Sequence, residues 1–77
     1  MDDLQTDIRL IHLLLTRLER ISADSHWARR ASGTRGSLLR LMERQEAGAA
    51  ISPEEASELI QAGFDILEQA AREKRGI

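Results

Sequence analysis

Residues 24–26 bring together the side-chain types of a hydrolase triad: an aspartate, a serine and a histidine. Nucleophilic catalysis needs a base within hydrogen-bond reach of the nucleophile and an acid that orients the base. Three consecutive residues cannot converge in this way, because neighbours on a helix point about 100° apart. Asp24 and Ser25 are better interpreted as caps of a helix start, and no catalytic residue is expected here.

Other residues that could bind a metal or exchange protons are few. His12 and His26 are the only histidines, no HExxH or Glu-x-x-His spacing occurs, and cysteine is absent. Neither a metal site nor a thiol nucleophile is therefore expected. Glu54, Glu55 and Glu58 fall in the first turns of an expected helix, where negative charge is favourable without catalysis. We expect that the protein is not an enzyme and holds no cofactor.

The segment from Ser32 to Ser37 has the glycines and hydroxyl groups of a phosphate-binding loop. It lacks the Gly-Lys-Ser/Thr ending and the preceding strand that give such loops their geometry. A nucleotide site is therefore not favoured.

The elements that must position these residues are helical. Ala, Glu, Lys, Leu and Arg supply 40 of the 77 residues, a composition typical of long helices. The balance of 42% hydrophobic and 31% charged residues, with a net charge of −2, is that of one folded domain covering residues 1–77. No apolar run approaches the length of a membrane span, and the acidic start is unlike a signal peptide. A cytoplasmic protein is the expectation.

Apolar residues recur with helical spacing in three segments, 3–22, 25–47 and 53–74. The first carries an apolar arc wide enough to touch two neighbours, either both within the chain or one in a partner. In the second, Trp27 starts the apolar face and is interpreted as an anchor of the core. In the third, Ser52 precedes Pro53 and forms a capping box with Glu55.

No segment alternates with the period of a strand, so the sequence predicts an all-α fold, a small antiparallel three-helix bundle. Gly63 lies inside the buried arc of the third helix, where it is expected to give clearance to a large side chain such as Trp27 or Phe64. Two glycines weaken the second helix. A continuous helix is favoured because its apolar face stays in phase, and a break near Gly33–Gly36 is the alternative.

One surface of the expected second helix is unusual. Small residues and arginines share the side away from its apolar face: Arg29, Gly33, Gly36 and Arg40, flanked by Ser32 and Ser37. Arg35 is a further candidate for contact with a partner. Residues 26–44 hold five arginines and one glutamate, a local charge of +4 in a chain that is net negative. Small residues permit close approach of another backbone, and arginines bind carboxylates or phosphates.

Three interpretations of this surface remain open. The leading one is a protein–protein interaction module, either a homodimer or an adaptor for a larger protein. The second, less favoured, is a regulator that binds nucleic acid or a phosphorylated ligand through the arginines. In the third, the glycines mark a kink and the arginines are solvated. No membrane partner is expected.

Overall fold

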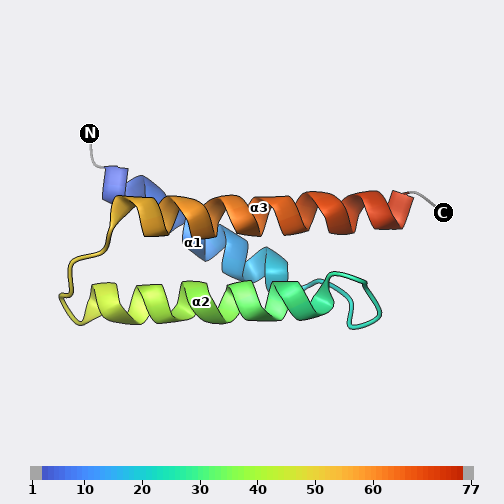
Figure 1. Ribbon diagram of the computed structural model, residues 1–77, viewed down its shortest axis with the longest axis horizontal. Helices are drawn as coiled ribbons and strands as arrows, with labels where there is room; N and C mark the ends of the chain where they lie inside the picture. Colours follow the sequence, from blue (N-terminus) through green and yellow to red (C-terminus); the bar gives the residue numbers. More distant parts are fainter. Residues whose placement is uncertain (1–2, 76–77) are drawn as a thin grey trace.

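The computed structural model describes residues 3–75, which form three α-helices (Figure 1). Helix α1 spans Asp3–Glu19, α2 spans Ala28–Glu46 and α3 spans Pro53–Arg75. Helices α2 and α3 lie side by side and run in opposite directions, while α1 crosses behind them (Figure 1). Each helix packs against both others, which confirms the predicted all-α three-helix bundle. None of the described helices has the length and apolar character needed to cross a membrane.

Two helix ends differ from the prediction by three residues, and two others differ by one. Helix α1 ends at Glu19 rather than at residue 22, and α2 begins at Ala28 rather than at residue 25, because residues 20–27 form turns between them. Helix α2 continues through Gly33 and Gly36 without a break. Only Gly48, after the end of α2, adopts a positive φ among the described residues, at 86°. The predicted continuous helix is therefore correct.

The core receives side chains from all three helices. The two side chains most completely removed from solvent are Leu14 of α1 and Leu38 of α2. Around them lie the other buried apolar residues: Ile11, Leu18, Ala31, Leu41, Met42, Ala56, Ile60 and Ile66. Both flanks of the wide arc on α1 have intramolecular neighbours, because α1 packs against α2 and α3 alike.

Gly63 brings α1 and α3 together. A Cβ atom at this position would lie 3.0 Å from both Cδ1 and Cδ2 of Leu14 and 3.4 Å from its Cγ. Gly63 therefore makes room for Leu14. The large side chain expected at this position from the sequence was Trp27 or Phe64. The sequence pattern places Gly63 on the buried side of its helix, but it does not say which neighbouring side chain lies against it.

The start of α2 is held by the far end of the chain. Ser25 accepts a hydrogen bond at its Oγ from the Trp27 N–H (3.0 Å) and donates to Glu73 Oε1 (2.7 Å). The other oxygen of Glu73 accepts from the His26 N–H (3.0 Å). These bonds lower the pKa of Glu73, the Ser25 hydroxyl contributing most. Ser25 thus acts in the turn before the helix rather than as the N-cap residue itself.

The start of α3 follows the predicted cap in part. Ser52 Oγ accepts from the Glu55 N–H (3.3 Å), as a capping box requires. The Ser52 hydroxyl donates to Glu54 Oε1 (2.9 Å), which is the largest cause of a lowered pKa at Glu54. The carboxylate of Glu55 does not complete the box but accepts from Arg44.

We predict opposite effects for alanine at two glycines. Gly63→Ala should lower the free energy of unfolding by about 1 kcal/mol, because overpacking against the fully buried Leu14 costs more than the better helix propensity returns. Gly36→Ala should raise it by about 0.5–1 kcal/mol, since its Cβ meets only the end of Arg40 at 3.5 Å. Urea unfolding followed by circular dichroism measures both, and a stabilised Gly63→Ala would contradict the close packing.

We predict that Glu73 makes the fold acid-sensitive. Its folded-state pKa lies below the ordinary value of 4.5, so its contribution to stability is complete above that pH. This contribution is lost as the pH falls through the lowered pKa. Glu73→Gln should reduce the loss of stability between pH 5 and pH 2, measured by urea unfolding at each pH. The control Glu19→Gln, on an exposed side chain of α1, should keep the wild-type profile; equal profiles for all three proteins would contradict the assignment.

Candidate functional site

The residues of the expected α2 surface are not all on one face. Arg29, Ser32, Gly33 and Arg40 are exposed. A Cβ at Gly33 would have open space around it, with no heavy atom within 4 Å. Gly36 is less exposed and lies beside the Arg40 side chain. The glycines therefore leave the exterior of α2 unobstructed and do not bend the helix.

Arg35 is less exposed than Arg29 and Arg40. It is half-buried, and its Nε has no hydrogen-bond partner among the described residues. Arg35 lies two helical turns before Met42, so the two share one side of α2. Met42 lines a small gap together with Ile8 and Ile11 of α1. Helical spacing places Arg35 about 140° around the axis of α2 from Arg40.

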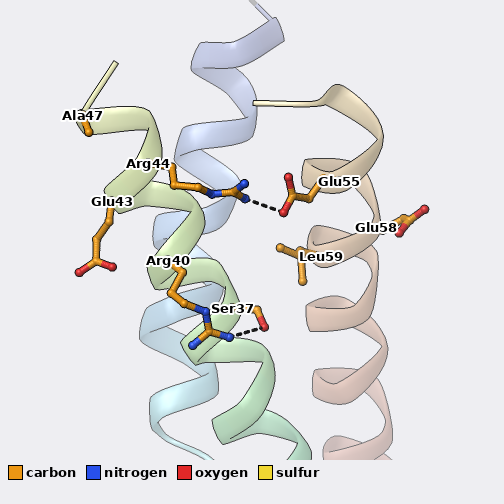
Figure 2. Close-up of a pocket in the computed structure, with 8 residues that line it drawn as sticks. All are labelled: Ser37, Arg40, Glu43, Arg44, Ala47, Glu55, Glu58 and Leu59. Atoms are coloured by element: carbon orange, nitrogen blue, oxygen red, sulfur yellow. Dashed lines mark hydrogen bonds and ion pairs between the residues drawn. The ribbon is translucent and has the colours of Figure 1, made fainter. Parts of the chain in front are cut away.

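An open groove runs between the C-terminal half of α2 and the start of α3, as Figure 2 shows. One wall carries Ser37, Arg40, Glu43, Arg44 and Ala47 from α2, and the other carries Glu55 and Glu58 from α3. Leu59 lies between the walls and is half-buried. The α2 wall is thus mainly basic, with the Glu43 carboxylate directed away from α3 at its outer edge (Figure 2), and the α3 wall is acidic.

The charged groups of the groove are only partly paired. Arg44 Nη2 reaches across to Glu55 Oε2 at 2.5 Å and links the two walls (Figure 2). Arg40 Nη2 donates to the Ser37 hydroxyl at 3.2 Å and has no carboxylate partner among the described residues. Glu58 is exposed on the outer rim of α3, also without an ion-pair partner in that part of the chain. Arg40 and Glu58 therefore remain available to an external group, as does the exposed Glu43 at the outer edge of the α2 wall, which has no ion-pair partner among the described residues.

A second hollow continues the same face toward the start of α2. It is lined by Trp27 and Arg30 of α2 and by Ala62, Asp65, Ile66 and Gln69 of α3. The Arg30 guanidinium lies over the Trp27 ring, 5.7 Å from its centre. Trp27 is half-buried and packs against the core, as expected of an anchor. The basic-and-acidic arrangement thus repeats at this end, with Arg30 on one wall and Asp65 on the other.

We name this surface the α2–α3 face. On α2 it holds a basic column with small residues in its middle: Arg30, Gly33, Ser37, Arg40 and Arg44. On α3 it holds an acidic column, likewise with a small residue in its middle: Glu55, Glu58, Ala62 and Asp65. Helix α1 lies behind α2 and α3 in both views, so no described element covers this face (Figures 1 and 2).

The acidic wall was missing from the candidate residues predicted from sequence, although its signal was present. Residues 53–68 contain five acidic side chains and no basic one, while residues 26–44 carry +4. An antiparallel pairing of the two helices sets these charges opposite one another. Locating Glu55 and Glu58 beside the arginines requires the helix register, which the sequence pattern does not provide.

The residues considered as a hydrolase triad lie apart from this face. The Ser25 hydroxyl is bonded to Glu73, and His26 is exposed in the turn before α2. No group of three or more metal-ligating side chains occurs within the described residues. Comparison with models of known protein families, with curated proteins and with solved structures finds no match.

We predict that the ion pair across the groove adds little to stability. Both side chains are about half exposed, 48% for Arg44 and 41% for Glu55, so solvent screens their attraction. A double-mutant cycle with Arg44→Ala and Glu55→Ala should give a coupling free energy of about 0.2–1 kcal/mol in low salt, and less in 1 M NaCl. A coupling energy well above this range would show that the pair is a main determinant of the fold.

Proposed function

We propose that the chain is a small helical protein–protein interaction module that binds its partner through the α2–α3 face. The observation that carries this proposal is the pairing of a basic and an acidic column on one uncovered face, with apolar side chains between them. Apolar surface supplies affinity, and the charges at the rim fix orientation and exclude wrong partners. The partner is a second copy of the chain or a larger protein.

The chemistry of the face favours a protein over a nucleic acid. Arginines that bind a phosphate backbone work best without neighbouring carboxylates, since phosphate and carboxylate repel. Here Arg44 is already engaged by Glu55, and the exposed Glu58 and Asp65 belong to the opposite wall. A protein surface that offers both charges matches both walls, whereas a polyanion matches only one.

The small residues support the same proposal. Gly33 leaves open space on α2, and Ser37 and Ala62 border the middle of the face. Side chains this short let a partner helix approach the α2 and α3 backbones more closely than large residues would. An isolated exposed glycine lowers helix stability by about 1 kcal/mol relative to alanine. Close approach of a partner helix is a physical reason for a glycine at position 33.

A site-specific photo-cross-linking experiment tests the proposal. A photoreactive phenylalanine analogue at position 29, which is exposed one turn before Gly33, should form a covalent adduct with protein on irradiation in cells, because that position borders the α2–α3 face without filling the space at Gly33. The same analogue at position 12, exposed on α1, should form little.

The adduct from position 29 should decrease at least fivefold when Arg40→Glu is added, which separates specific docking from random capture. Nuclease treatment distinguishes the alternative, since an adduct with nucleic acid is shortened by it. Equal labelling from positions 29 and 12, or an adduct whose yield does not change with Arg40→Glu, would contradict the proposed function.

A further inference from the structure

Resting on the proposed function, we infer that the partner is a second copy of this chain, bound face to face across a twofold axis that runs along the groove. In the dimer, Arg40 of each copy pairs with Glu58 of the other. The α2–α3 pair of one copy packs against the α2–α3 pair of the other, so four helices form the centre of the dimer. Helix α1 of each copy lies on the outside.

The charge pattern selects this axis. A twofold axis lying in the interface and parallel to the groove exchanges the two walls, so α2 of one copy faces α3 of the other. The basic column of each copy then lies against the acidic column of its partner. A twofold axis across the groove would instead place arginines against arginines, which like-charge repulsion disfavours.

The heights of the charges along the groove agree with this arrangement. The Arg44–Glu55 bond marks one level at which α2 and α3 lie opposite each other. Arg40 is four residues before Arg44, and Glu58 is three residues after Glu55 on the antiparallel helix. Both therefore lie about one turn farther along, at roughly the same level. Rotation about an axis along the groove preserves height, so Arg40 meets Glu58 of the second copy.

The middle and far end of the face are also compatible with self-docking. Gly33 and Ser37 of one copy lie at the level of Ala62 and Asp65 in the other, and their short side chains allow the helices to approach. Arg30, which lines the second hollow together with Asp65, lies about 6 Å farther along the groove than Asp65, a distance that the long arginine side chain can span. The half-buried Leu59, Ala62 and Trp27 provide apolar surface beneath the charged rims.

The exposed area of the single chain is large for its mass. The accessible surface is 5664 Å², whereas a compact monomer of 8.7 kDa exposes about 4700 Å² by the usual scaling. The excess of roughly 1000 Å² is comparable to the about 800 Å² that each partner buries in a standard interface. Dimerisation through the elongated α2–α3 face would bring the exposed area per chain back to the ordinary range.

Charge reversal with a mixing control tests the inference. Arg40→Glu creates two Glu–Glu contacts in the dimer, and Glu58→Arg creates two Arg–Arg contacts. Each single variant should raise the dimer dissociation constant at least tenfold, measured by sedimentation equilibrium or light scattering in low salt. Combining both changes in one chain should restore dimerisation.

Mixing the two single variants should also restore it, because a heterodimer of the Arg40→Glu and Glu58→Arg chains has two opposite-charge contacts. Arg9→Glu and Glu19→Arg, on exposed positions of α1, change the net charge equally and should leave the dissociation constant unchanged. Circular dichroism of each single variant checks that the helices remain folded.

A wild-type chain that stays monomeric at all concentrations up to 1 mM would overturn the second-copy inference. The inference would also be overturned if the Arg40→Glu and Glu58→Arg variants each dimerised with the wild-type dissociation constant, or if mixing them did not restore dimerisation. The proposed function would survive that result if position 29 still forms an Arg40-dependent adduct of a mass other than twice that of the chain. Failure of both experiments would remove both proposals.

Discussion

The contact of Leu14 with Gly63 determines how the three helices fit together. A fully buried leucine of α1 lies directly against a position of α3 that has no side chain, so the two helices approach closely there. Close approach on this side draws α1 behind α2 and α3. The opposite side of the α2–α3 pair is left uncovered as a result (Figure 1). The exposed face is thus a consequence of where the third helix packs.

The antiparallel pairing of α2 and α3 places a mainly basic wall beside an acidic wall on that face. Net positive charge on α2 and acidic side chains along most of α3 produce walls of opposite sign once the helices lie together. Only one cross-groove ion pair forms among the described residues, between Arg44 and Glu55. Arg40 instead donates a hydrogen bond to the Ser37 hydroxyl. The face therefore keeps charge that the single chain does not neutralise, which is the physical basis of the proposed interaction.

The fold was largely predictable because its determinants are local. Helical spacing of apolar residues indicated all three helices, and Ser52 with Pro53 located the start of α3 to the residue. The start of α2 was misplaced because its turn depends on Glu73, about fifty positions away, which no local pattern reveals. Arg35 is half-buried, which the sequence pattern did not show, because the burial of a residue near the edge of an apolar arc depends on the neighbouring helix. The α3 wall of the groove required the register between helices.

The hydrogen bonds of Glu73 at one end of α3 and the Arg44–Glu55 pair at the other also restrict how the bundle can be misassembled. These two links are 18 residues apart along α3, about 27 Å at 1.5 Å per residue. Sliding α3 along α2 by a single turn, about 5.4 Å, would break both links and carry Gly63 away from Leu14, placing a bulkier residue against it. Weak polar contacts at the ends and one tight apolar contact in the middle thus disfavour the same alternatives, so a small core of common aliphatic residues specifies one packing.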